Sequence, residues 1–194
     1  MHQLPFRFRF FLVVFVSITS VFYSCEEEAD LFRRFDLREG EHYATPRVME
    51  TLKSSKLVFL AKFDSSCRYH FENTGFQDSK NKLLGFSDCN SMHHENSARF
   101  VWQWYNNRME IFAYCYVNGE RKEQFVGVVD LEETNQYEIS MTDNAYVFRL
   151  NNGDPVTIER QATCRTGVYY MLWPYFGGSL PAPHNMHLEI KIIY

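Results

Sequence analysis

Residues 98–117, which read ARFVWQWYNNRMEIFAYCYV, decide the fold class of this chain. Large apolar residues alternate along both halves of the stretch, and alternation is the period of a β strand, whose successive side chains point to opposite faces. The Asn106-Asn107 pair between the halves favours a tight hairpin, because Asn tolerates left-handed backbone. In the second half Phe112, Tyr114 and Tyr116 share one face and smaller apolar residues the other. This strand is therefore predicted to be central, covered on both sides or lining a cleft.

The same β pattern extends outward from this hairpin in both directions, with turn signals such as Asn118-Gly119 about every 8–12 residues. Strands are expected near residues 33–37, 56–63, 98–105, 108–117, 124–131, 137–142, 145–150, 156–160, 168–175 and 187–194. The chain is thus predicted to be all-β, a two-sheet antiparallel β-sandwich of about ten strands. Residues 48–54 are expected to form a helical turn, and the polar stretch 74–97 an inserted loop.

Length and charge narrow the function classes. The chain has 194 residues, enough for one domain with a proper core. Its formal net charge is −4 and it has no basic block, which argues against nucleic acid as a partner. The unusual feature is an aromatic content of 17%.

The first 25 residues have the pattern of an export signal. Arg7 and Arg9 precede an apolar run over residues 10–23, which is shorter than the about 20 residues of a membrane-spanning helix. The run ends at Ser24-Cys25, followed by three glutamates at 26–28. This junction resembles the lipobox of bacterial lipoproteins, and the acidic cluster resembles the surface-export signal of Bacteroidetes. A plain secretory signal cut near Ser24 and an uncleaved anchor are the alternatives.

The lipoprotein resemblance implies a domain plan and a location. Residues 1–24 would be the signal peptide, Cys25 the lipidated residue, 25–55 a tether and irregular segment, and 56–194 the sandwich. The protein would be anchored by lipid in the outer membrane, at the cell surface; otherwise it would be secreted or periplasmic. Cleavage removes two arginines and no acid, so the charge of −4 becomes −6. Anionic polymers are then less natural ligands, unless Arg99 and its neighbours make a local exception.

Cysteines and Asx residues bear on disulfides and metals. Cys67, Cys89, Cys115 and Cys164 allow three disulfide pairings, among which the sequence does not choose. No cysteine or histidine spacing typical of zinc is present, and no cofactor is expected. Calcium is a candidate ligand, with oxygens from the turns at Asp143, Asn144, Asn151, Asn152 and Asp154.

Two segments carry a family resemblance. Residues 96–102 (NSARFVW) and 111–121 (IFAYCYVNGER) resemble central strands of concanavalin A-like jelly rolls, an architecture shared by laminin-G-like modules and many secreted glycan-active proteins. The resemblance covers about residues 56–194. The paired acidic strand of laminarinase-like hydrolases is absent, as is the arginine-rich strand with a Gln-x-His partner of the alginate-lyase type. The resemblance thus implies a fold and no particular reaction.

The candidate ligand site centres on the 98–117 hairpin. His93 and His94 precede it and can supply an acid or base near neutral pH; the alternative is an exposed polar loop. Arg99 is placed to hold a carboxylate, or else to pair with Glu110 across the hairpin. Tyr114 and Tyr116, joined by Trp102 and Trp104 from the partner strand, form an aromatic face that is either a binding surface or core packing.

A second candidate is the aromatic loop over residues 173–184. Trp173 and His184 belong to it, and its prolines and glycines give it a stiff course. Such a loop can serve as a sugar platform, because the CH groups of a pyranose stack on aromatic rings. The alternative is a hydrophobic plug that closes the end of the sandwich.

Three functions compete. The favoured hypothesis is a non-catalytic surface lipoprotein that binds a glycan or another extracellular ligand through His93, His94, Arg99, Trp104, Tyr114, Tyr116, Trp173 and His184. The second is a structural or assembly protein of the cell envelope. The third is a polysaccharide lyase or hydrolase with His93 or His94 as base and Tyr114 or Tyr116 as acid.

Overall fold

The stretch quoted above forms the hairpin of β6 (Ser97–Tyr105) and β7 (Arg108–Val117). The two strands pair antiparallel and the pairing ends at Tyr105 opposite Arg108. Asn106 and Asn107 between them have φ of 50° and 59°. Two consecutive left-handed residues are the requirement of a type I′ turn, so the predicted hairpin is confirmed together with its turn.

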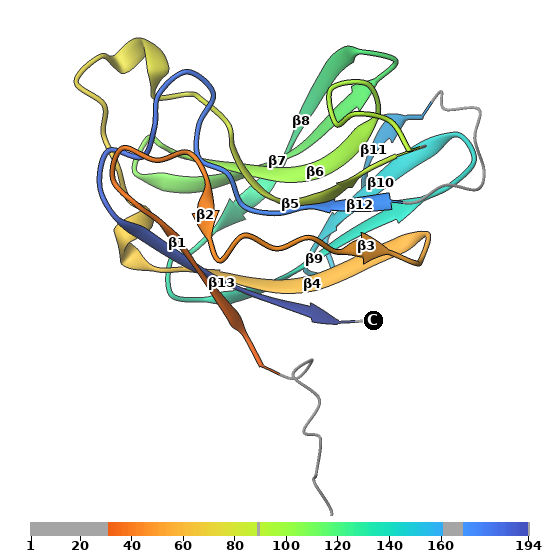
Figure 1. The fold of residues 1–194 in the computed structure, drawn as a ribbon, viewed down its shortest axis with the longest axis horizontal. Helices are drawn as coiled ribbons and strands as arrows, with labels where there is room; N and C mark the ends of the chain where they lie inside the picture. Colours follow the sequence, from red (N-terminus) through yellow and green to blue (C-terminus); the bar gives the residue numbers. More distant parts are fainter. Residues whose placement is uncertain (1–30, 89, 161–168, 194) are drawn as a thin grey trace, which may run out of the picture.

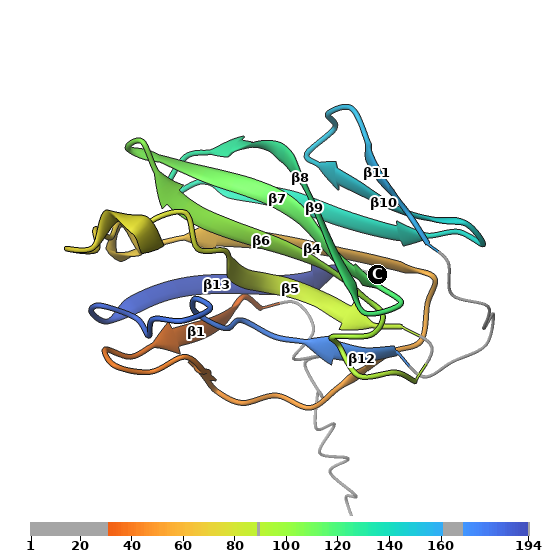
Figure 2. The same ribbon diagram turned by 90° about the horizontal axis from the view of Figure 1, so that it is seen from above.

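A computed structural model of the chain describes residues 31–88, 90–160 and 169–193. In these ranges two antiparallel sheets lie face to face (Figure 1 and Figure 2). The seven-stranded sheet has the order β11 (Val156–Glu159), β10 (Ala145–Leu150), β9 (Thr134–Met141), β4 (Lys56–Phe63), β13 (Met186–Ile193), β1 (Arg33–Leu37) and β2 (Ala44–Thr45). The six-stranded sheet has the order β3 (Thr51–Leu52), β12 (Tyr169–Leu172), β5 (Asn81–Ser87), β6, β7 and β8 (Glu120–Val129). The predicted all-β sandwich is confirmed.

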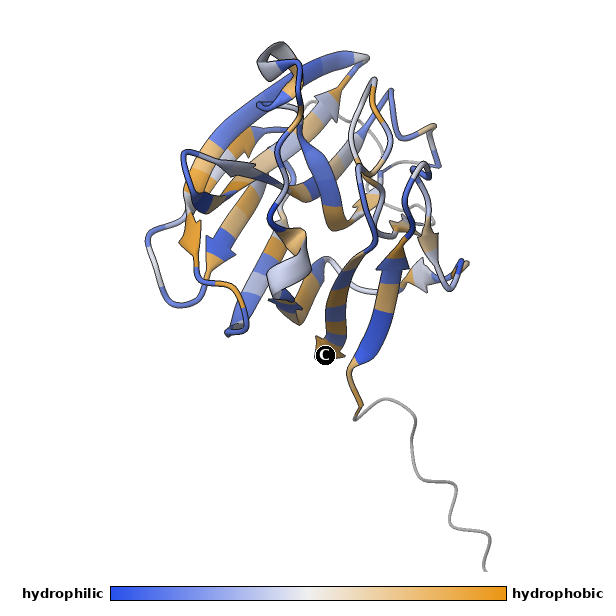
Figure 3. Cartoon of the chain, turned by 90° about the vertical axis from the view of Figure 1, so that its left-hand side faces the viewer, coloured by the Kyte–Doolittle hydropathy of each residue, from blue (hydrophilic) through white to orange (hydrophobic). Residues whose placement is uncertain are grey.

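The core lies between the sheets and is built from every second residue of each strand. Figure 3 shows this alternation as hydrophilic and hydrophobic stripes along the strands. Phe59 of β4 stacks on Tyr137 of β9 at 5.0 Å, and Phe100 of β6 meets Tyr137 edge-on at 5.1 Å. All three side chains are fully buried, and burial of each phenylalanine stabilises the fold by about 1.5–3 kcal/mol.

Two expectations about the segments between strands are wrong. Residues 48–54 form no helical turn, because the two-residue strand β3 pairs with β12 in this segment. The polar stretch 74–97 contains β5, whose Leu83, Leu84 and Phe86 are fully buried, besides the short 3-10 helix η3 (Thr74–Phe76). Asn81 is tolerated in β5 because its amide donates to the Tyr69 hydroxyl and accepts from the Gly177 amide.

The N-terminal part of the described chain belongs to both sheets. β1 pairs with the last strand, β13, over five residue pairs, and β2 extends that sheet as its edge. β3 is the edge of the other sheet. A further 3-10 helix, η2 (Ser65–Cys67), follows β4.

Several expectations concern residues that the structure does not describe. The signal peptide at 1–24, the lipidation site Cys25, and the cysteines Cys89 and Cys164 all lie outside the described residues. Cys67 and Cys115 are described, and both are buried free thiols. Burial raises the pKa of each thiol. Over the described ranges, no helix is long and apolar enough to cross a lipid bilayer.

Candidate functional site

The candidate site lies on the outer face of the six-stranded sheet, the face that points away from the seven-stranded sheet. Core-facing residues of β6 and β7 alternate with residues that point outward. The strand register places Gly85, Arg99, Tyr114 and Glu123 side by side on β5, β6, β7 and β8. Directly paired residues point to the same face, so these four form one row on the outer face.

Arg99 is the buried cation of this row. Its residue is 6% exposed, and no acidic partner is recorded for its guanidinium among the described residues. Its Nε is buried without any hydrogen-bond partner there, and the guanidinium carbon lies 5.6 Å from the ring centre of Tyr114. Gly85 makes this position possible, since a Cβ there would lie 2.6 Å from Arg99 Cγ. Burial lowers the pKa of Arg99, which remains charged.

Lys82 is the second cation of the outer face. A β-bulge between Lys82 and Leu84 lets Lys82 and Gly85 both point outward. The Lys82 ammonium donates to the carbonyl oxygens of Lys80 and Gly177, each at 2.8 Å. It lies 5.7 Å from the ring centre of Tyr114. Burial, followed by repulsion from other cations, lowers the pKa of Lys82 to about 8.

Aromatic rings extend the site toward the predicted histidines. Tyr114 and Tyr116 have ring centres 5.8 Å apart, and Tyr116 is 5.2 Å from His94. His94 is in turn 4.1 Å from His93. Burial, and then Arg99, lower the pKa of His93, so its ring is neutral at pH 7. Burial and the neighbouring Tyr116 raise the pKa of Tyr114 to about 12, so that phenol is protonated.

Hydrogen bonds fix the histidine loop to the sheet. The Ser97 hydroxyl donates to the His93 carbonyl, and the Gly119 amide donates to the Glu95 carbonyl. The Asn118 amide donates to the Asn96 side chain. The loop is therefore held on the turn between β7 and β8, which places both histidines beside Tyr116.

A separate polar chain occupies the hairpin end of the outer face. Lys80 donates to Gln103, Gln103 donates to Glu110, and Arg108 donates to the other oxygen of Glu110, each at 2.7 Å. The expected alternative pairing of Arg99 with Glu110 is therefore wrong. Glu110 lies opposite Gln103, four residue pairs along the strands from Arg99, whose own partner in the register is Tyr114.

The expected contribution of Trp102 and Trp104 to the aromatic face is wrong. Both residues point into the core, where Trp102 is fully buried and Trp104 is 8% exposed. The register pairs them with Ile111 and Met109, which are core residues, whereas Tyr114 and Tyr116 point the other way. Residues an even number of positions apart on a strand point to the same face. Trp102 and Trp104 therefore both point into the core, and neither reaches the outer face.

Trp173 and His184 also lie away from the site. The Trp173 ring stacks on the core residue Phe35 at 5.3 Å and is covered by Arg33, so it packs as the plug alternative predicts. His184 Nε2 is bonded to the Ser66 carbonyl at 2.8 Å, beside η2. Neither residue contacts the outer face of the six-stranded sheet.

The structure adds Lys82, which the sequence did not suggest because it lies in a segment expected to be a loop. It also places beside Lys82 one residue of the predicted aromatic loop 173–184, Tyr175, which follows β12. Isolated bridges connect Tyr43 to Tyr175 and Tyr175 to Lys82. The Lys82 ammonium is 5.7 Å from the Tyr175 ring centre. No local pattern indicates that Lys82 and Tyr175 lie together, because their proximity depends on pairing between distant segments.

No metal centre is found in the parts of the chain that the structure describes. Three or more His, Cys, Asp or Glu side chains close enough to share an ion do not occur there. Of the residues proposed for calcium, Asn151 uses its side chain in hydrogen bonds to β9. Its side chain accepts from the Gln136 amide and donates to Asn135.

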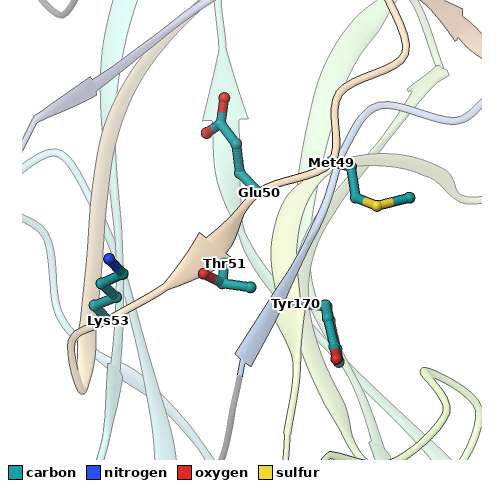
Figure 4. Close-up of a pocket in the computed structure, with 5 residues that line it drawn as sticks. All are labelled: Met49, Glu50, Thr51, Lys53 and Tyr170. Atoms are coloured by element: carbon teal, nitrogen blue, oxygen red, sulfur yellow. The ribbon is translucent and has the colours of Figure 1, made fainter.

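A hollow of about 720 Å³ lies at the β3–β12 edge of the same sheet (Figure 4). Met49, Glu50, Thr51, Lys53 and Tyr170 line it. Glu50 is bonded to Arg33 at 3.0 Å, and Figure 4 shows its carboxylate pointing away from Tyr170. The hollow thus offers few convergent polar groups, and the charged groups of the site lie elsewhere on the sheet.

Comparison with known proteins supports the fold. No protein-family model and no curated protein matches the chain. Among solved structures, it is similar to the alginate lyase AlyC3, with a TM-score of 0.57 and 12% identity over 84% of this chain and 74% of that one. It is similar to a laminarinase catalytic domain from Thermotoga petrophila, with a TM-score of 0.56 and 9% identity over 83% and 75% of the two chains.

A third similar structure is a mixed-linkage glucan enzyme of glycoside hydrolase family 16 from Bacteroides ovatus. Its TM-score is 0.53 at 10% identity, over 84% of this chain and 81% of that one. The TM-scores show a shared fold, the jelly-roll sandwich that the sequence resemblance implies, at identities of only 9–12%. They do not transfer a reaction.

Proposed function

We propose that this protein binds an acidic polysaccharide through the outer face of its six-stranded sheet. The observation that carries the proposal is the Arg99 guanidinium, buried with no acidic partner recorded among the described residues. A buried charge without a counter-ion is costly, and a fold retains one where a ligand supplies the opposite charge. A uronate carboxylate fits a guanidinium in two-pronged fashion.

The surroundings of Arg99 suit the ring of a sugar as well as the negative charge of its carboxylate. Lys82 adds a second cation, and both cations lie within 5.7 Å of the ring centre of the largely buried Tyr114. Aromatic faces stack on the CH groups of pyranose rings, while the cations select an acidic sugar. The names of the similar structures include enzymes that act on alginate and on glucans, which supports a carbohydrate ligand.

The proposed location rests on the sequence. A lipid on Cys25 would anchor the protein in the outer membrane, and the acidic residues 26–28 would direct it to the cell surface. The sheet would then face extracellular glycans. Metabolic labelling with a fatty-acid analogue tests this, because Cys25→Ala should abolish the label.

Binding is tested by affinity electrophoresis and calorimetry on an acidic polyuronate and on a neutral glucan. The native protein should be retained by the polyuronate, and Arg99→Met should lose at least about tenfold in affinity. Arg38→Met, an exposed arginine just after β1, is the matched control and should bind normally. Retention by the neutral glucan alone, or undiminished binding by Arg99→Met, would overturn the proposal.

Cleavage by β-elimination is the second candidate, and the contact of His94 with Tyr116 favours it. His93 or His94 would take the proton beside the uronate carboxylate, which Arg99 neutralises. The carbon–hydrogen electron pair becomes a double bond as the glycosidic carbon–oxygen bond breaks. Tyr114 or Tyr116 would deliver its proton to the departing oxygen.

The lyase candidate predicts an unsaturated sugar end that absorbs ultraviolet light. Product should accumulate with the native protein and fall at least about 100-fold in His94→Ala, the usual contribution of an acid or base. His70→Ala, at an exposed position away from the site, is the control. If the native protein binds polyuronate without forming product, binding alone is its function.

A further inference from the structure

A continuous row of side chains crosses the outer face of the six-stranded sheet. Strand register and isolated bridges connect, in order, Tyr43, Tyr175, Lys82, Val101, Phe112 and Phe125. Directly paired residues share a face, so the row is perpendicular to the strands. It passes beside Arg99 and reaches beyond β5 to the segment before β2.

The far end of this row is an exposed aromatic platform. Tyr43 is 54% exposed and meets Tyr175 edge-on at 5.0 Å. His42 stacks on Tyr175 at 5.3 Å, nearly parallel to it. Main-chain hydrogen bonds from Lys82 to Tyr175 and from Phe176 to His42 fix these rings to β5. The platform is therefore part of the sheet's framework rather than a loose loop.

Arg47 gives this platform a positive charge. Its guanidinium carbon is 4.4 Å from the centre of the Tyr43 ring. No acidic partner is recorded for Arg47 over residues 31–88, 90–160 and 169–193. The pairing of Tyr43 with Arg47 thus repeats, at the rim, the pairing of Tyr114 with Arg99 at the centre.

We propose that Tyr43 and Arg47 form an outer subsite for a second acidic sugar of the same polysaccharide. This inference rests on the proposed function and adds a direction to it, because the ligand would lie across the strands. Three strand spacings of about 4.8 Å separate Tyr43 from β6, the strand that carries Arg99, or about 14 Å in all. One pyranose ring cannot span that distance, whereas a short oligosaccharide can. The charge of Arg47 selects an acidic sugar over a neutral one.

The test measures affinity against chain length. Defined oligouronates from dimer to octamer are titrated by calorimetry into the native protein, Tyr43→Ala, Arg47→Met and the control Arg38→Met. Affinity should rise with length in the native and control proteins. Both subsite variants should bind the shortest ligands normally and lose about tenfold for the longest, as expected for one stacked, charged contact. Tyr43→Phe keeps the aromatic ring, so its affinity should still rise with the length of the ligand.

The outcomes separate this inference from the proposed function. If Tyr43→Ala and Arg47→Met keep the full gain with length while Arg99→Met loses binding, the outer subsite is refuted and the central site remains. If the native protein binds no uronate of any length, both proposals fail. Thermal melting of each variant shows whether it is folded. If Tyr43→Ala is not folded, Tyr43→Phe supplies the conservative comparison.

Discussion

At the residue scale, the proposed binding function and the stability of the fold are expected to oppose each other at Arg99. Its charge is buried and lacks an acidic partner in the described chain. Arg99→Met removes this cost while keeping an unbranched apolar stem. We expect its free energy of unfolding to be equal to or higher than that of the native protein, although ligand binding is lost. Denaturant titration measures this, and a marked loss of stability would show that the arginine is structural.

Lys82 predicts a pH dependence above neutrality. Burial, then repulsion from Arg99 and Arg121, lower its pKa from 10.5 to about 8, against a smaller opposing effect of Glu123. A bound carboxylate stabilises the charged form and raises that pKa. Affinity should therefore be constant below pH 8 and fall as the pH rises above it. The total fall should be up to about tenfold for each unit by which the bound ligand raises the pKa of Lys82. Calorimetry between about pH 7 and 9.5 measures this.

The control for this prediction is Lys82→Arg, which stays charged throughout the range. Its affinity should not change with pH. Burial raises the pKa of Tyr114 and of Tyr175, so neither phenol should ionise in this range. A native protein whose affinity is flat across the range would show that Lys82 does not face the ligand.

At the scale of elements, the contact of β5 with β6 sets the position of the site. At Gly85 a Cβ would lie 2.1 Å from the Ala98 carbonyl oxygen and 2.6 Å from Arg99 Cα. Gly85→Ala should push β6 away, lower stability by about 1–3 kcal/mol and weaken ligand binding. Gly178→Ala, where a Cβ meets nothing within 4 Å, is the control and should leave both unchanged. Thermal melting and calorimetry distinguish the two variants.

At the scale of the whole molecule, one buried ion pair joins the two sheets. Asp88, just after β5, accepts from Arg160 at 2.6 Å and from the Tyr146 hydroxyl at 2.6 Å. Arg160 follows β11, in the opposite sheet. Asp88→Ala would leave a buried guanidinium without its counter-ion, so we expect a loss of about 3–5 kcal/mol in the free energy of unfolding.

The matched control is Glu50→Ala, which removes the ion pair with Arg33. Both side chains of that pair are more than 40% exposed. Exposed pairs contribute little, so a change of about 0–1 kcal/mol is expected. Equal effects of the two substitutions in denaturant titration would contradict the structural role of Asp88.

Charge is also distributed at the molecular scale. The chain is acidic, with a formal net charge of −4, and an acidic ligand is not suggested by that total. The fold nevertheless gathers Lys82, Arg99 and Arg121 on one face. Local potential rather than net charge governs the encounter with a charged ligand. An acidic net charge is therefore compatible with an acidic ligand at this face.

The sequence by itself determined the all-β class and the central hairpin, because alternation and turn residues act locally. It also identified Arg99, Tyr114, Tyr116 and the two histidines as candidates, and the structure brings these five together. It placed Trp102 and Trp104 on the aromatic face with Tyr114 and Tyr116, whereas the register pairs both tryptophans with core residues. It missed β5 because a buried strand that begins with polar residues resembles a loop.

Only the tertiary structure decided which face of the hairpin points outward and what lies beside it. Tyr43, Tyr175 and Lys82 are distant in sequence and meet through bridges between separate segments. The burial of Arg99 without an acidic partner is likewise a property of packing, since it depends on Gly85 of the neighbouring strand. Local patterns record the period of a strand, whereas a site is formed by strand order and register, which arise only when distant segments pair.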